Sequence, residues 1–133
     1  MKKLYVFTLL LLCCHYLPAQ TWTGATNSDW NNASNWNPAG VPTSTGNVII
    51  PGSLSQYPVM NGKVTINSID MQPGSLLNVN GSELVLNGVN TNINFSGATL
   101  NNSNGATDII LTINTGTSGF LTYFRSNTVN DNI

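Results

Sequence analysis

Hydrophobic positions from residue 47 onward follow a two-residue period, because apolar side chains alternate with Asn, Thr or Ser in short runs. This alternation predicts β-strands with one buried side and one side that faces solvent. The runs occupy 64–66, 69–71, 77–79, 84–86, 93–95 and 109–113. No segment has the three-and-four-residue spacing of an amphipathic helix, so we expect an all-β fold.

Glycine-containing pairs separate these runs. They are Pro73-Gly74, Asn80-Gly81, Asn87-Gly88, Ser96-Gly97 and Asn104-Gly105. Such pairs form tight turns, since glycine readily adopts positive φ. A repeated unit, Gly-small-x-Leu, begins at Gly74, Gly81 and Gly97.

Short strands between regular turns predict a right-handed parallel β-solenoid (β-helix) of about four rungs, each about 20 to 24 residues long. Each strand would then form one side of a coil. The alternative is an antiparallel β-sandwich, whose strands usually contain about five residues or more.

The two-residue period also predicts which side chains point inward. They are Ile66, Met71, Val79, Leu86, Phe95 and Leu100. Stacked coils would let asparagines hydrogen-bond to one another along a ladder. The candidates are Asn78, Asn80, Asn87, Asn90, Asn92 and Asn94. Alternatively, asparagine occupies these positions only because it tolerates turns and solvent.

Residues 1–19 have the pattern of a cleaved secretory signal. Lys2 and Lys3 precede an apolar run over 4–12, and a small residue, Ala19, precedes the expected cleavage site before Gln20. The pattern predicts a secreted or cell-surface protein. The apolar run is shorter than the roughly 20 residues of a spanning helix, so no membrane span is expected.

Charge and composition exclude some classes of function. Beyond the signal, Lys63 and Arg125 are the remaining cations against five carboxylates, and both cysteines and the only histidine lie within the signal. Two cations cannot supply the counterion release that drives nucleic-acid binding. Leu, Ile, Val and Phe make up 28 of the 113 residues from Thr21 onward, which favours a folded core over disorder.

The residues available for catalysis are few. Without His or Cys, histidine triads, thiol nucleophiles and zinc sites are excluded. A glycosidase needs two facing carboxylates, for which the candidates are Asp29, Asp70, Glu83, Asp108 and Asp131. Asp70 and Glu83 lie in the repeat region and could come onto adjacent rungs, but we expect these two to be isolated, solvated charges instead. The alternation of Asn27, Asp29 and Asn31 is similar to a calcium loop but lacks its glycine and terminal Glu. We therefore predict no enzyme activity, no cofactor and no metal site.

The segment 20–46 contains all three tryptophans, Trp22, Trp30 and Trp36. An open solenoid end must be covered, and large aromatic side chains suit that role, so we predict a Trp-rich N-terminal cap. The alternative hypothesis is that one or more of these rings stacks on a sugar. The three tryptophans are therefore also the candidate glycan-binding residues.

The spacing of motifs in this segment resembles the N-terminal opening of Bacteroidetes-type secreted, repeat-rich β-solenoid surface proteins and autotransporter-like β-helix passengers. The motifs are Trp22-Thr23-Gly24, Asp29-Trp30, Asn35-Trp36, Val41-Pro42 and Val48-Ile49-Ile50. The resemblance implies surface exposure or release, and adhesion to cell-surface glycans or other surface proteins.

Together these observations predict a signal peptide at 1–19, a cap at 20–46 and solenoid rungs at 47–133. The predicted function is a non-catalytic structural or adhesive surface module. The alternative is the N-terminal capping part of a larger glycan-processing β-helix enzyme, of which this chain would be a fragment. The last rung is rich in aromatic and aliphatic residues (120–124), which predicts self-association through that end.

Overall fold

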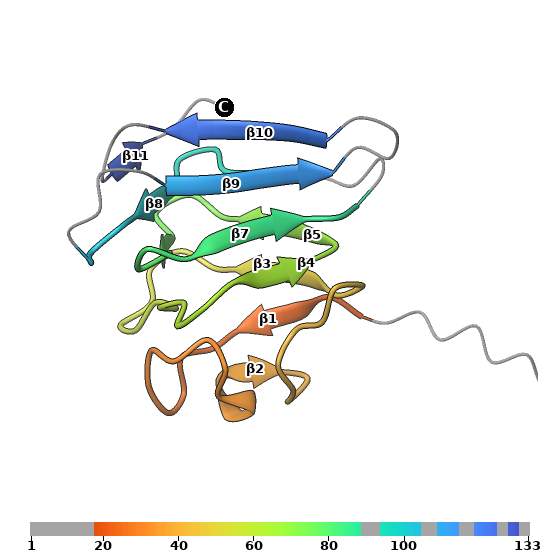
Figure 1. Cartoon of the computed structure of the whole chain (residues 1–133). Helices are drawn as coiled ribbons and strands as arrows, with labels where there is room; N and C mark the ends of the chain where they lie inside the picture. The colour runs from red at the N-terminus through yellow and green to blue at the C-terminus, as the bar shows by residue number, and fades with distance from the viewer. Residues whose placement is uncertain (1–17, 89–93, 105–108, 115–118, 125–127, 131–133) are drawn as a thin grey trace, which may run out of the picture.

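The computed structural model describes residues 18–88, 94–104, 109–114, 119–124 and 128–130, and side chains up to residue 113. Within these residues the fold is all-β, with one turn of 3₁₀ helix, η1 (Ala33–Asn35). The strands are β1 (Gln20–Trp22), β2 (Trp36–Asn37), β3 (Asn47–Ile50), β4 (Val64–Ile66), β5 (Ser68–Met71), β6 (Leu76–Asn78), β7 (Glu83–Leu86), β8 (Thr99–Asn101), β9 (Ile109–Asn114), β10 (Gly119–Phe124) and β11 (Thr128–Asn130) (Figure 1).

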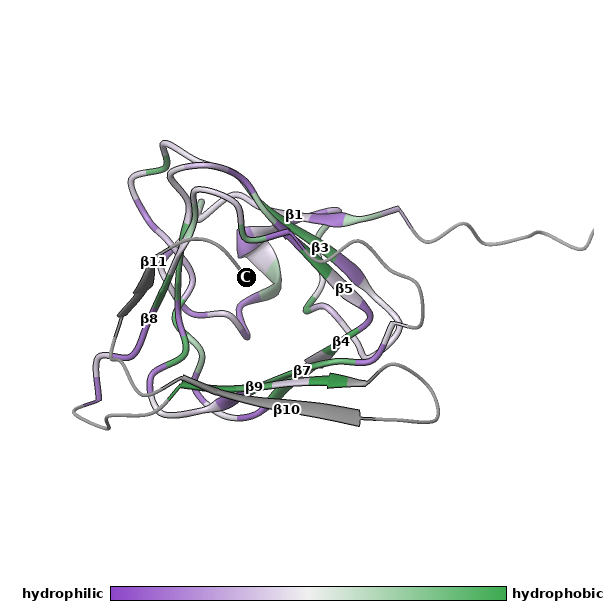
Figure 2. Ribbon diagram, turned by 90° about the horizontal axis from the view of Figure 1, so that it is seen from above, coloured by the Kyte–Doolittle hydropathy of each residue, from purple (hydrophilic) through white to green (hydrophobic). Residues whose placement is uncertain are grey.

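The strands form three open sheets, ordered β2-β1-β3-β5, β10-β9-β7-β4 and β11-β8-β6. Viewed from above, the three sheets lie on the three sides of a triangle around a shared interior (Figure 2). From β5 to β8, strands that follow one another in the chain belong to different sheets. The chain therefore turns from one side of the triangle to the next.

Strands that neighbour each other within a sheet are parallel from β3 to β9. Asn47 lies opposite Ser68, Val64 opposite Leu84 and Leu76 opposite Thr99. The strands β7 and β9 are also parallel. These pairings confirm the predicted parallel strands in this region and do not fit an antiparallel sandwich.

The last two strands contradict the prediction of parallel pairing to the end of the chain. β10 pairs with β9 antiparallel, with Gly119 opposite Asn114, and β11 pairs with β8 antiparallel. Only four residues separate β9 from β10 in the sequence. A parallel crossover needs about a dozen residues or more, so these two strands are too close in the sequence to pair in parallel.

The interior is filled by the predicted side chains. Burial alternates along β3 and β5, as the pleat of a half-buried strand requires. All six residues predicted to point inward are buried, with exposed fractions from 0% to 8%. They are Ile66, Met71, Val79, Leu86, Phe95 and Leu100.

The corners between the sides stack along the axis. The amide of Asn67 donates to the carbonyl of Gly46 at 2.8 Å, and the amide of Gly88 donates to the carbonyl of Asn67 at 2.8 Å. The three glycines that open the repeated unit, Gly74, Gly81 and Gly97, have φ values of 79°, 73° and 69°. The repeat therefore reflects a left-handed corner residue, a conformation that favours glycine.

Candidate functional site

The three tryptophans form one buried cluster at the N-terminal end of the sheets. Trp22 ends β1, Trp36 begins β2, and Trp30 lies in the loop between them, with exposed fractions of 1%, 3% and 1%. The ring of Trp36 meets Trp22 edge-on at a centroid distance of 5.0 Å and Trp30 at 4.8 Å. The burial expected of a cap is confirmed.

The indole N–H groups of Trp22 and Trp36 both donate hydrogen bonds to backbone carbonyls inside the protein. Trp22 Nε1 donates to the Gln56 carbonyl and Trp36 Nε1 to the Trp30 carbonyl, each at 2.9 Å. Sugar stacking needs an exposed ring face, and none of the three rings presents one. The hypothesis that Trp22, Trp30 and Trp36 bind glycan does not fit this arrangement.

Asn35 organises the loop that carries Trp30. Its side chain is fully buried, and its Oδ1 accepts from the amides of Thr26 at 2.9 Å and Asn27 at 3.1 Å. Its Nδ2 donates to Asn27 Oδ1 at 2.8 Å and to the Asp29 carbonyl at 2.9 Å. This role of Asn35 was not predicted from the sequence, although the Asn35-Trp36 pair is one of the motifs that resemble Bacteroidetes-type surface proteins.

The loop oxygens that resembled a calcium site are occupied by hydrogen bonds within the loop. Asn27 Oδ1 accepts from the Asp29 amide at 2.9 Å, and Asp29 Oδ1 accepts from the Asn31 amide at 3.0 Å. These hydrogen bonds form Asx-turns, in which an Asn or Asp side chain accepts from the backbone amide two residues later. Across the described ranges, no three His, Cys, Asp or Glu side chains gather as a metal site would require.

Glu83 joins three successive coils on the outside of one sheet. Lys63 Nζ lies 2.9 Å from Glu83 Oε2, and Thr112 Oγ1 donates to Glu83 Oε1 at 2.7 Å. The Lys63 ammonium and then the Thr112 hydroxyl hold the pKa of the Glu83 carboxyl below its ordinary value of 4.5, against the opposing effect of desolvation. The expectation of an isolated solvated charge is wrong for this residue.

Asp70 is also bonded to the next coil, because Asn94 Nδ2 donates to Asp70 Oδ1 at 2.7 Å. Asp70 belongs to β5 and Glu83 to β7, which lie in two different sheets. The structure therefore does not bring these two carboxylates together as a facing pair. Asp108 and Asp131 lie outside the described residues.

An exposed row of polar side chains follows one corner of the triangle along its axis. We call it the polar corner, and it comprises Asp29, Asn61, Asn78, Asn80 and Ser103. Asn61 Nδ2 donates to Asp29 Oδ1 at 3.3 Å, and Asn80 Nδ2 donates to Asn61 Oδ1 at 3.4 Å. Asn78 Nδ2 continues the row by donating to Ser103 Oγ at 2.6 Å.

The predicted asparagine ladder is thus present in part. Asn78, Asn80 and Asn94 each bond to a side chain on a neighbouring coil. Asn87 donates its backbone amide to the Ile66 carbonyl at 2.8 Å. The two other candidates, Asn90 and Asn92, lie outside the described residues.

A family model described as a domain of unknown function (DUF8693) matches residues 21–132. The chain belongs to this family. The match to DUF8693 covers the tryptophan cluster and all three sheets apart from Gln20, the first residue of β1. Comparison with curated proteins and with solved structures finds no match. Where this DUF8693 chain is described, no helix is long and apolar enough to cross a lipid bilayer.

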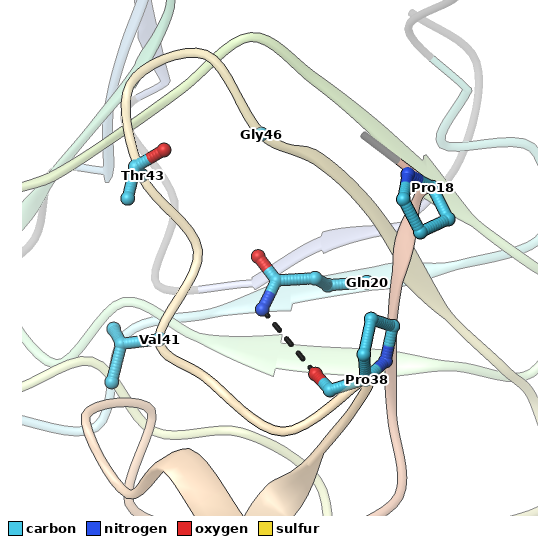
Figure 3. A pocket seen from close by; sticks show the side chains of 6 residues that line it. All are labelled: Pro18, Gln20, Pro38, Val41, Thr43 and Gly46. Atoms are coloured by element: carbon cyan, nitrogen blue, oxygen red, sulfur yellow. Dashed lines mark hydrogen bonds between the residues drawn. The ribbon is translucent and has the colours of Figure 1, made fainter. Parts of the chain in front are cut away.

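A cavity of about 240 Å³ lies beside the start of β1 in this DUF8693 domain (Figure 3). Its lining is Pro18, Gln20, Pro38, Val41, Thr43 and Gly46, none of which has an ionisable side chain. Gln20 Nε2 donates to the Gly40 carbonyl at 2.7 Å, so its amide is used to hold the neighbouring loop. The cavity offers a small, mainly apolar surface and no acid or base for catalysis.

Proposed function

We propose that this DUF8693 chain is a non-catalytic, secreted or cell-surface module with a structural or adhesive role. We further propose that its fold is a right-handed parallel β-solenoid of about four rungs with a Trp-rich N-terminal cap. The parallel registers of β3 to β9 and the triangular arrangement in Figure 2 support this architecture. The signal pattern of residues 1–19 supports export.

One observation carries the proposal of a non-catalytic role. Each of the three described carboxylates, Asp29, Asp70 and Glu83, accepts a hydrogen bond from a side chain on a neighbouring coil. Acid–base catalysis needs a carboxyl group positioned to exchange a proton with substrate, and glycoside hydrolysis needs two that face each other. These three carboxylates instead tie one coil to the next.

The polar corner is the surface that we propose for contact with glycans or other surface proteins. Asn61 and Ser103 are exposed, and Asn78 and Asn80 are partly exposed, so amide and hydroxyl groups are available along several coils. An amide side chain both donates and accepts hydrogen bonds, which suits the hydroxyl groups of a sugar. Because the corner repeats the same chemistry, binding would be weak at each coil and stronger for a ligand that spans several.

Binding can be tested with the purified protein on a glycan array and on immobilised cell-surface polysaccharide. Asn61→Arg places a bulky cation in the middle of the polar corner and should abolish binding. The matched control is Ser44→Arg, which adds the same side chain at an exposed position outside the corner and should bind normally. Equal binding by both variants would exclude the polar corner, and measurable turnover of a polysaccharide would overturn the non-catalytic assignment.

The alternative proposal is that the chain caps a larger glycan-processing β-helix enzyme. It is supported by the position of β10 and β11, which each end their sheet in the described part of the chain and could receive further strands. Coding sequence downstream of residue 133 discriminates between the two proposals. Further repeats with paired carboxylates would favour the enzyme, whereas a stop codon at that point would favour the surface module.

A further inference from the structure

Three Asn-Gly pairs lie at corners within the described residues: Asn61-Gly62, Asn80-Gly81 and Asn87-Gly88. Asparagine is chemically labile, and it is most labile before glycine. The backbone nitrogen of the glycine can attack the asparagine side-chain carbon, because no Cβ on the glycine obstructs the approach. The three sites share the Asn-Gly pair, so the hydrogen bonds that the fold gives each attacking amide become decisive.

Two of these attacking amides are held by hydrogen bonds in which either the glycine or the acceptor residue is buried. The amide of Gly88 donates to the backbone carbonyl of Asn67 at 2.8 Å, and Gly88 itself is buried. The amide of Gly81 donates to Oδ1 of Asn102 at 2.7 Å, and Asn102 is only 3% exposed. A nitrogen held in this way is fixed in direction and is kept from turning toward the side chain that precedes it.

The pair at Asn61-Gly62 is held less firmly. The amide of Gly62 donates to the hydroxyl of Ser82 at 3.0 Å, in an exposed position where a serine rotation breaks the bond. The side chain of Asn61 is exposed, and its two bonds in the polar corner are long, at 3.3 Å to Asp29 and 3.4 Å from Asn80. Water can replace each of these contacts.

We infer that, of the three Asn-Gly pairs within the described residues, the one at Asn61 deamidates fastest in the folded protein, and that Ser82 sets the rate. In the first step the Gly62 nitrogen bonds to Cγ of Asn61, the Cγ–Nδ2 bond breaks, and ammonia leaves with the proton of the Gly62 amide. Water then opens the succinimide ring to give aspartate or isoaspartate at residue 61. No oxidant or cofactor takes part.

The product changes the polar corner. A carboxylate at residue 61 would replace the amide that donates to Asp29, so a hydrogen bond would become a repulsion between like charges. Isoaspartate would also lengthen the backbone by one methylene group at a corner. This inference does not depend on whether the polar corner binds glycans.

The test is to incubate the native protein under mildly alkaline conditions and to follow deamidation by mass spectrometry over time. Cleavage after Lys63 and after Glu83 places Asn61, Asn80 and Asn87 on three separate peptides. Digestion in heavy-oxygen water marks any deamidation that occurs during the digestion itself. Labelling by isoaspartyl methyltransferase detects the isoaspartate product independently of mass.

We expect Asn61 to deamidate several-fold faster than Asn80 and Asn87 in the native protein, and all three to react at similar rates in denaturant. Ser82→Ala should raise the rate at Asn61 several-fold, and Ser82→Thr, which keeps the hydroxyl, should largely restore it. Ser75→Ala, which removes a hydroxyl at a different corner, should have no effect. The inference is overturned if Asn80 or Asn87 reacts as fast as Asn61 in the native protein. It is also overturned if Ser82→Ala changes no rate, or raises all three rates together through general unfolding.

Discussion

Replacement of Trp36 by alanine removes the ring that contacts both other tryptophans of the buried cluster. Deleting a buried aromatic side chain costs about 3 to 5 kcal/mol, and Trp36 is 97% buried, being 3% exposed. The change also removes the edge contacts to Trp22 and Trp30, each about 0.5 to 1.5 kcal/mol, and leaves the Trp30 carbonyl without its donor. Because these contributions overlap, we expect a loss of about 4 to 5 kcal/mol.

A loss of this size is comparable with the whole stability of a marginal domain, which is about 5 to 15 kcal/mol. Urea unfolding followed by far-ultraviolet circular dichroism measures it without relying on the fluorescence of the replaced residue. Trp36→Phe is the matched variant, since it keeps a ring in the cluster and removes only the N–H donor and part of the area, so its loss should be about half as large. A loss below about 1 kcal/mol for Trp36→Ala would refute the cap. If Trp36→Ala kept its stability yet lost glycan binding, the indole ring would be a binding surface and the buried arrangement described above would be wrong.

Three further predictions follow from side chains and edges elsewhere in the fold. Ser75→Ala should leave the free energy of unfolding unchanged or raise it by up to about 1 kcal/mol, because Ser75 Oγ is buried without a hydrogen-bond partner. Ala98 occupies the equivalent position one coil later. Thermal unfolding measures the change, and a clear loss of stability would mean that the hydroxyl has a partner. Lys63→Met should cost less than about 1 kcal/mol at neutral pH, since the Lys63 side chain is 60% exposed. The bonded carboxylate of Glu83 has a pKa below its ordinary 4.5, so its contribution is complete above that value and is lost as the pH falls through the lowered pKa. The difference between Lys63→Met and the native chain in urea unfolding should therefore vanish on acidification, and a difference that persists there would exclude the ion pair as its cause. Sedimentation should show concentration-dependent species larger than a monomer, because β10 and β11 end their sheets, whereas a monomer at all concentrations would contradict self-association.

The interior of the fold could be predicted because its signal is local. A strand places alternate residues on opposite faces, so the polarity of Val64, Thr65 and Ile66 alone indicates which side chains turn inward. Gly74 and Gly81 likewise indicated corners from the sequence alone, because a left-handed φ favours glycine wherever it occurs. The hairpin formed by β9 and β10 was missed because its strands have the same alternation as parallel ones. Only the length of the connecting segment distinguished them.

The side-chain bonds between neighbouring coils, called ties below, could not be predicted. The number of residues that separates the two partners differs from one bond to the next. Asn61 lies 32 residues from Asp29 and 19 residues from Asn80, although all three belong to one row. Asn78 and Ser103 are 25 residues apart, and Glu83 and Thr112 are 29 apart. Each coil has its own insertions, so a partner on the next coil has no fixed offset to search for. The asparagines and carboxylates that could form such bonds can be identified from the sequence, but which of them bond to each other cannot.

These bonds between coils bear on how a domain with no cysteine among its described residues is stabilised. A tie between partly exposed side chains contributes only a few tenths of a kcal/mol to about 1 kcal/mol, so no single tie replaces a disulfide. In a stack of coils, however, stability is a sum over the contacts between neighbours, and the ties are distributed over successive contacts. Asn61 bonds to the coil before it and to the coil after it, and Glu83 does the same through Lys63 and Thr112. Freeing the Glu83 carboxylate for proton transfer would break its bonds to both neighbouring coils at once. This double bonding of Glu83 supports the proposed non-catalytic role of the chain.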